Sequence, residues 1–200
     1  WKKLQDAAPA GKTKGVLLDL RSNPGGLITA AVDVADEFLP DVLIVSVKGR
    51  NALSNASYFG KPGQQFSGVP VVVLIDAGSA SASEILAGAL QDHKRATLMG
   101  SRSFGKGSVQ NVIYLDNGDA FKLTTARYYT PDGRSIQAQG IVPEILLQGN
   151  AKAGFTEKDL PKHIKAGTDS GLQAEAGVVL GGEAYIGKAL AYLKQQETKP

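Results

Sequence analysis

The chain has 200 residues, of which 42% are hydrophobic and none is cysteine. This length supports one domain with its own core, and the lack of cysteine excludes disulfides, thiolate zinc sites and cysteine nucleophiles. The 22 basic and 19 acidic residues give a net charge of +3 and are scattered, which predicts a solvated surface and no nucleic-acid partner, and no apolar run approaches a membrane span.

Strand and helix patterns alternate through the first hundred residues. Apolar runs predict strands over 15–21, 43–47, 69–75 and 96–99, and helical repeats predict helices over 27–39 and 82–92. Residues 51–68 are polar and glycine-rich, and we expect an excursion there. Strands that alternate with helices imply parallel pairing with crossover helices, so the fold class is α/β with a mixed sheet.

A hairpin and a terminal helix are expected in the second half. The patterns over 109–115 and 120–129 predict strands joined at Asn117-Gly118, a tight-turn signal in which both central residues accept positive φ. The pattern weakens after residue 145, and residues 148–182 are rich in Gly, Ala and Lys. A final amphipathic helix over 183–196 is predicted to pack through one stripe, formed by Ile186, Ala189, Leu190 and Leu193.

A serine opens the second predicted helix, directly after the most strand-like segment. Ser81 would lie at the carboxyl edge of the sheet, where N–H groups of the first helical turn are unpaired and favour negative charge. Acyl transfer passes through an oxyanion, which such donors stabilise by roughly 3 kcal/mol each. The amide of Ala82 is one candidate donor. A second would come from the turn after the first strand, where Gly25 and Gly26 are competing candidates.

A lysine between two glycines is the candidate base, because the chain has only two histidines and lacks a G-x-S-x-G elbow. To act as a base, Lys106 must lower its pKa from ~10.4 toward ~7–8, which requires an apolar pocket without a paired carboxylate. Gln110 would share a strand face with Lys106 and could accept a hydrogen bond from its amine. The scarcity of histidine also argues against a metal site, and no cofactor is predicted.

Each candidate also has a simpler interpretation. Ser81 and Glu84 match the capping box S-x-x-E, and helix caps far outnumber catalytic serines. A lysine flanked by glycines is usually a surface loop cation. Residues 100–106 also match the G-x-x-x-x-G-K part of a phosphate-binding loop. Against that alternative, Gly107 replaces the hydroxyl that would hold Mg²⁺, and a strand pattern follows where a helix should begin.

Several long motifs together resemble the C-terminal processing peptidases, also called tail-specific proteases. They are DLRSNPGG (19–26), GSASASEILAGALQD (78–92), FGKGSVQ (104–110), YYTPDGRSI (128–136) and GIVP (140–143). The resemblance covers roughly residues 12–147, with the motifs in the family's order and spacing. By position it implies a nucleophile at Ser81, a general base at Lys106, a lysine-orienting glutamine at Gln110, and oxyanion donors at Ala82 and the Gly25-Gly26 turn.

The resemblance implies a spiral core related to the crotonase and Clp-protease architecture. It implies a serine endopeptidase that cleaves unstructured protein tails with apolar C-terminal residues through an acyl-enzyme, in the bacterial periplasm or cell envelope. An activating or adaptor protein and a homo-oligomer are compatible with it.

The chain also departs from the family's usual organisation. Family members carry an N-terminal helical region and a PDZ domain ahead of the strand that ends here at Arg21. We therefore expect a fragment, with a protease core over 1–147 and a Gly/Ala/Lys-rich extension with a terminal helix over 148–200. A catalytically silent peptide-binding or scaffold module that uses the same groove is the alternative from another class.

Overall fold

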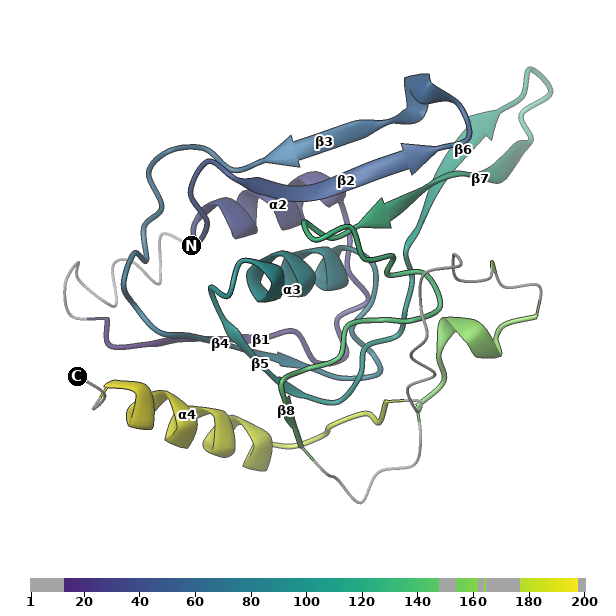
Figure 1. Ribbon diagram of the computed structural model, residues 1–200. Helices are drawn as coiled ribbons and strands as arrows, with labels where there is room; N and C mark the ends of the chain where they lie inside the picture. The colour runs from purple at the N-terminus through teal and green to yellow at the C-terminus, as the bar shows by residue number, and fades with distance from the viewer. Residues whose placement is uncertain (1–12, 148–153, 162–163, 165–176, 198–200) are drawn as a thin grey trace.

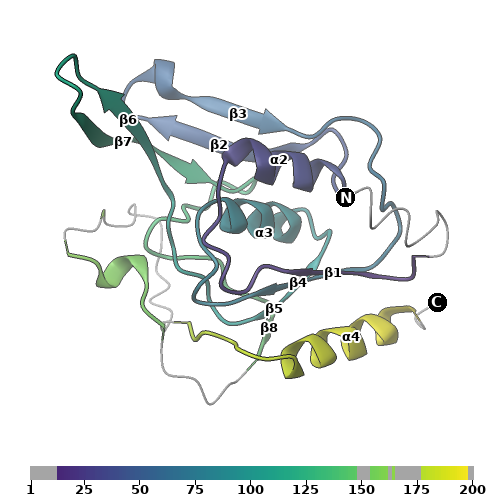
Figure 2. The same cartoon turned by 180° about the vertical axis from the view of Figure 1, so that it is seen from behind.

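Two four-stranded sheets enclose two helices in the computed structural model, which describes residues 13–147, 154–161, 164 and 177–197. The elements are β1 (Val16–Asp19), α2 (Ile28–Asp36), β2 (Leu43–Gly49), η1 (Ala52–Ser54), β3 (Ala56–Phe59), β4 (Val71–Ile75), α3 (Ala82–Asp92), β5 (Thr97–Gly100), β6 (Ser108–Tyr114), β7 (Ala120–Tyr129), β8 (Ile145–Leu146), η2 (Glu157–Asp159) and α4 (Ala184–Glu197). From one side to the other, the layers are the antiparallel sheet, α2 with α3, the parallel sheet, and α4 (Figure 1; Figure 2).

The parallel sheet has the strand order β1-β4-β5-β8. All five residues of β4 are buried, as the uninterrupted run of branched side chains predicts. Val71, Val73 and Ile75 pack into the core cluster with α2 and α3, whereas Val72 and Leu74 pack on the opposite face with α4. The predicted parallel pairing is therefore confirmed for this sheet.

The antiparallel sheet, of order β3-β2-β7-β6, corrects the prediction of a single mixed sheet. The strand expected over 43–47 leaves the parallel sheet and pairs antiparallel with β3 and β7. Val45 and Val47 are buried while Lys48 is exposed, and a sheet with one solvated face shows such a pattern. Strand β3 lies inside the stretch 51–68, for which only an excursion was expected.

The hairpin between β6 and β7 has a longer turn than predicted. The Leu115 N–H donates to Asp119 O at 2.8 Å and the Gly118 N–H donates to Leu115 O at 3.0 Å. Gly118 has a φ of +87°, but Asn117 has no positive φ, so only one residue of the expected pair is left-handed. This arrangement is typical of a turn that ends in a left-handed glycine.

Helix α4 covers the outer face of the parallel sheet. Ala189 and Leu193 are buried in the cluster that contains Val72 and Leu74. Leu190 was predicted to lie in the packing stripe, but it is 45% exposed, so that part of the prediction is wrong. Much of the Gly/Ala/Lys-rich stretch 148–182 lies outside the described residues. Among the residues described, none of the helices combines the length and apolar character needed to span a bilayer.

Candidate active site

Ser81 lies where the chain leaves β4, an inner strand of the parallel sheet, and enters α3. Strand β4 ends at Ile75, and the turn that follows is organised by the fully buried Asp76. Asp76 Oδ1 accepts hydrogen bonds from the N–H groups of Gly78 at 2.9 Å and Ser22 at 2.8 Å. The turn before Ser81 is thereby tied to the turn that follows β1.

The backbone of Ser81 is held in a sparsely populated conformation. Its φ is 57° and its ψ is −116°. The predicted capping box with Glu84 is present, yet an ordinary N-cap residue has extended backbone angles and needs no positive φ. A non-glycine residue in such a conformation costs of order 1–3 kcal/mol and is concentrated at functional sites. Capping alone therefore does not account for the geometry of Ser81.

The turn after β1 lies directly against the start of α3. A methyl group placed on Gly25 would lie 2.5 Å from Ala80 O and 2.6 Å from Ala82 N, so only glycine allows this approach. The Gly25 N–H donates to Asn23 Oδ1 at 2.9 Å. Among the described residues, neither the Ala82 N–H nor the Gly26 N–H has a protein acceptor. The structure thus leaves the Ala82 and Gly26 amides as free donors near Ser81.

The loop that carries Lys106 is joined to the start of α3 through one buried carboxylate. Glu84 Oε2 accepts from the N–H groups of Ser81 at 2.8 Å and Lys106 at 2.9 Å. Glu84 Oε1 accepts from the Gly105 N–H at 2.7 Å and the Ser103 hydroxyl at 2.5 Å. A single side chain therefore sets the spacing between the backbone of Ser81 and that of Lys106.

Burial dominates the electrostatics of this carboxylate. Glu84 is fully buried, and desolvation raises its pKa from 4.5 to about 7, although its hydrogen bonds to Ser103, Ser81, Gly105 and Lys106 lower the pKa. All four partners donate protons, so the ionised carboxylate is the form that can accept from each of them. We expect the hydrogen bonds that join the backbones of Ser81 and Lys106 through Glu84 to be strongest above about pH 7.

Glu84 Oε2 brings the backbones of Ser81 and Lys106 together, but the side chains of the predicted catalytic group are not bonded to one another in the described residues. Within the part of the chain that the structure describes, no hydrogen bond joins the Ser81 hydroxyl to the Lys106 amine, or that amine to Gln110. Lys106 is half-buried and Gln110 is exposed. A register shift between Val109 and Gln110 breaks the regular alternation on which the position of Gln110 was predicted.

The phosphate-loop alternative fails on the fold. Such a loop needs a helix after its lysine, whose N-terminus binds the phosphates. Strand β6 begins at Ser108, two residues after Lys106. The glycines of this loop instead allow close backbone packing, since a methyl group on Gly107 would lie 2.4 Å from Gln137 N.

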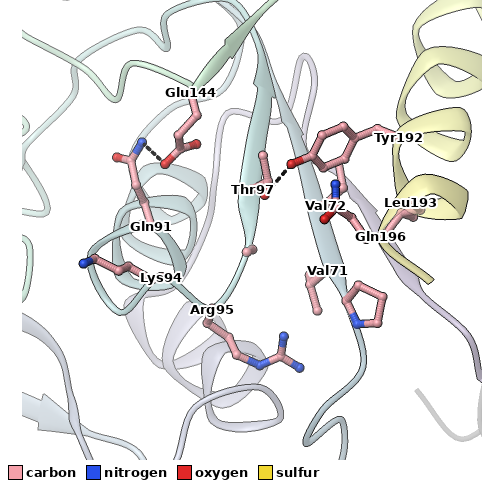
Figure 3. Close-up of a pocket in the computed structure, with 12 residues that line it drawn as sticks. Val71, Val72, Gln91, Lys94, Arg95, Thr97, Glu144, Tyr192, Leu193 and Gln196 are labelled. Carbon is pink, nitrogen blue, oxygen red and sulfur yellow. Dashed lines mark hydrogen bonds between the residues drawn. The ribbon is translucent and has the colours of Figure 1, made fainter. Parts of the chain in front are cut away.

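A separate pocket of about 350 Å³ lies at the far end of α3 from Ser81 (Figure 3). Its lining includes Thr97 at the start of β5 and Tyr192 of α4, whose hydroxyls are 3.4 Å apart. Glu144 Oε1 accepts from Gln91 Nε2 at 3.0 Å. The pocket opens at the amino ends of β4 and β5, whereas Ser81 follows the carboxyl end of β4, so it is not part of the candidate active site.

Sequence reasoning missed three residues that organise the site. Asp76 and Asn23 shape the two turns, and Glu84 was seen only as a capping partner. A signal was present for Glu84, because a carboxylate inside the mostly apolar run 82–90 must find buried partners. Nothing local to the sequence indicates that those partners include the Lys106 loop.

Most of the chain is similar to known proteins. A protein-family model described as peptidase family S41 matches residues 1–147. The carboxy-terminal-processing protease of Bartonella bacilliformis is 47% identical over 176 residues, which cover 84% of this chain and 41% of that protein. The carboxyl-terminal-processing protease of Synechocystis sp. is 39% identical over 175 residues, covering 88% and 39%.

Among solved structures, the photosystem II D1 C-terminal processing protease matches with a TM-score of 0.66 and 37% identity, covering 73% of this chain and 37% of that one. The chain thus spans about two fifths of the length of these curated relatives. The family match extends over well more than half of the chain and includes both turns and the Lys106 loop that Asp76 and Glu84 tie to the start of α3. The chain therefore belongs to peptidase family S41.

Proposed function

We propose that the protein is a serine endopeptidase in which Ser81 is the nucleophile and Lys106 is the general base. One observation carries the proposal: Glu84 Oε2 accepts from the N–H groups of both Ser81 and Lys106 and so holds the two residues at a fixed backbone spacing. In the reaction, the neutral Lys106 amine takes the proton of Ser81 Oγ, which attacks the peptide carbonyl. The leaving amine takes that proton, and water then hydrolyses the acyl-enzyme.

The oxyanion of this reaction would be held by two backbone amides. The free N–H groups of Ala82 and Gly26 support that role, while Gly25 provides the close approach between the two turns. Gln110 as the orienting partner of Lys106 stays a prediction.

A hollow lined by both apolar and polar side chains, the latter including Ser54, Asn111 and Thr125, is a candidate site for the substrate tail. It has a volume of about 320 Å³ and lies where α2 and β6 begin, just after the glycine turn and the Lys106 loop in sequence. Ile28, Val109 and Tyr128 contribute to its wall. The names of the relatives specify carboxyl-terminal processing. We therefore propose that the substrates are unstructured protein tails, and the preference for apolar C-terminal residues stays a prediction.

The proposal also covers how the chain is divided into domains. Residues 1–147 would form the protease core, with the spiral architecture of crotonases and Clp proteases, and residues 148–200 an extension of it. The periplasm or cell envelope as location, an activating or adaptor protein and a homo-oligomer stay predictions.

A second candidate function is a catalytically silent module that holds extended peptides in the same groove. The observation that favours it is the lack of a hydrogen bond between the Ser81 hydroxyl and the Lys106 amine in the described part of the chain. Catalytic hydrogen bonds often form only when substrate binds, so this observation does not displace the first proposal.

Substitutions in the full-length protein test the proposal against an unfolded substrate with an apolar tail. We expect Ser81→Ala to abolish cleavage, and Ser83→Ala, which removes a neighbouring hydroxyl in the same helix, to retain it. Lys106→Arg keeps the positive charge but cannot provide a free electron pair at neutral pH, so it should also abolish cleavage. Cleavage by Ser81→Ala refutes the assignment, and tail binding by the wild type without turnover supports the silent module.

A further inference from the structure

Two segments beyond the region matched by the family model reach the candidate active site. One contains η2 within residues 154–161, and the other, which we name the strap, comprises residues 177–182. The Ala77 N–H donates to Val178 O at 3.2 Å, and Asp76 Oδ2 accepts from the Leu180 N–H at 3.0 Å. The strap is thus bonded to the turn that leads to Ser81.

The strap also anchors the segment that contains η2. The Gly154 N–H donates to Gly177 O at 2.6 Å, and a methyl group on Gly154 would lie 2.3 Å from Ala77 Cβ. Within η2, Asp159 Oδ2 accepts from the N–H and the hydroxyl of Thr156 at 2.9 and 2.6 Å. These contacts fix Glu157 relative to the sheet.

Glu157 holds the Lys106 loop on both sides of the lysine. Its N–H donates to Phe104 O at 3.1 Å. Its Oε1 accepts from Gln137 Nε2 at 3.1 Å, and Gln137 Oε1 accepts in turn from the Gly107 N–H at 3.1 Å. Gln137 is fully buried and Glu157 is 9% exposed, so water does not readily replace either partner.

The donors and acceptors in these hydrogen bonds determine what the carboxylate of Glu157 does. The Gly107 N–H requires an acceptor, so the Gln137 amide must present its oxygen to Gly107 and its nitrogen to the opposite side. Glu157 Oε1 and Ile164 O are the acceptors there. An acceptor at Glu157 therefore stabilises the amide orientation that fixes Gly107, the residue that follows Lys106.

We propose that Glu157 is a positioning residue for Lys106, acting through Gln137 on Gly107. The proposal rests on the proposed function, since it assigns Glu157 to the base of that reaction. A displacement of about 1 Å in a catalytic group can lower a rate by about 100-fold. Loss of one of several restraints on the loop is expected to have a smaller effect and to lower the rate about tenfold.

The test compares Glu157→Leu, Glu157→Gln and the matched surface control Lys158→Ala in the full-length protein. The measurements are kcat and KM on a tail peptide, the rate at which a fluorophosphonate modifies the serine as a function of pH, and the melting temperature. We expect Glu157→Leu to lower kcat and the modification rate about tenfold with KM unchanged. Glu157→Gln keeps an acceptor oxygen, so it should stay within about twofold of the wild type, as should Lys158→Ala.

The pH midpoint of the modification rate separates positioning from a charge effect. A positioning role lowers the rate at every pH and leaves the midpoint unchanged in both variants, whereas a shifted midpoint in Glu157→Gln refutes the proposal. If Glu157→Leu does not fold, Glu157→Gln still decides, because a tenfold loss there contradicts the hydrogen-bond argument.

Failure of the inference is distinguishable from failure of the proposed function. Folded Glu157→Leu with wild-type rates overturns the inference alone, provided that Ser81→Ala resists modification. Modification of Ser81→Ala at the wild-type rate overturns the proposed function itself.

Discussion

Replacing Gly25 by alanine perturbs a tight backbone contact at the candidate active site. The added methyl group would lie 2.5 Å from Ala80 O and 2.6 Å from Ala82 N, which are backbone atoms that cannot rotate away. The φ of Gly25 is +89°, a region that alanine rarely adopts. Both effects push the glycine turn away from the start of α3.

The expected losses of activity and stability in Gly25→Ala follow from the contact distances and the φ of Gly25. Non-bonded heavy atoms prefer separations near 3.5 Å, so relief of the contact requires a displacement of about 1 Å. Such a displacement removes the alignment of one proposed oxyanion donor, and loss of such a donor typically lowers kcat by about 10²–10³-fold, or roughly 3–4 kcal/mol. The unfavourable φ adds a stability loss of about 1–3 kcal/mol.

The assay is cleavage of a tail peptide by full-length Gly25→Ala at a temperature where circular dichroism reports it folded. Gly26→Ala is the matched control, because a methyl group there meets no atom within 4 Å and the backbone N–H is kept. We expect Gly25→Ala to lose about 10²–10³-fold in kcat and Gly26→Ala to change little. Wild-type activity in Gly25→Ala, or equal losses in both variants, would refute the reasoning.

Two further predictions concern stability. Because burial raises the pKa of Glu84 from 4.5 to about 7, the native state holds a proton in that window that the unfolded state has released, so stability must fall as pH rises. Between pH 4.5 and about pH 7, urea unfolding should show that the free energy of unfolding of the wild type falls by about 3 kcal/mol relative to that of Glu84→Gln. A constant difference between the two proteins would contradict this. Leu193→Ala should lower the free energy of unfolding by about 2–4 kcal/mol because its side chain is buried under the sheet, whereas Leu190→Ala on the exposed side should cost less than about 1 kcal/mol. Thermal melts of the two variants check this, and equal shifts would show that α4 does not pack through Leu193.

The buried carboxylate of Glu84 holds the backbones of Ser81 and Lys106 at a fixed separation. Glu84 contacts the backbone of Lys106 and not its side chain, so its charge does not form an ion pair with the amine. A carboxylate bonded to the amine would favour the protonated lysine, which cannot act as a base. Glu84 can therefore hold the backbone of the proposed base in place without an ion pair to its amine.

Local patterns in the sequence determined most of the elements and the position of Ser81. The apolar run of β4 and the helical repeat of α3 depend only on neighbouring residues, so the strand, the helix and a serine between them were predictable. The hairpin was predictable for the same reason, although its turn proved longer.

Tertiary structure decided what joins these elements. Three features depend on residues far apart in the sequence: the placement of β2 in a separate antiparallel sheet, the close approach of Gly25 to the start of α3, and the hydrogen bonds of Glu84 to the Lys106 loop. The bond of Glu157 to Gln137 is of the same kind. Periodicity records which face of an element is buried, but not which distant segment covers it, because that choice depends on the packing of the whole chain.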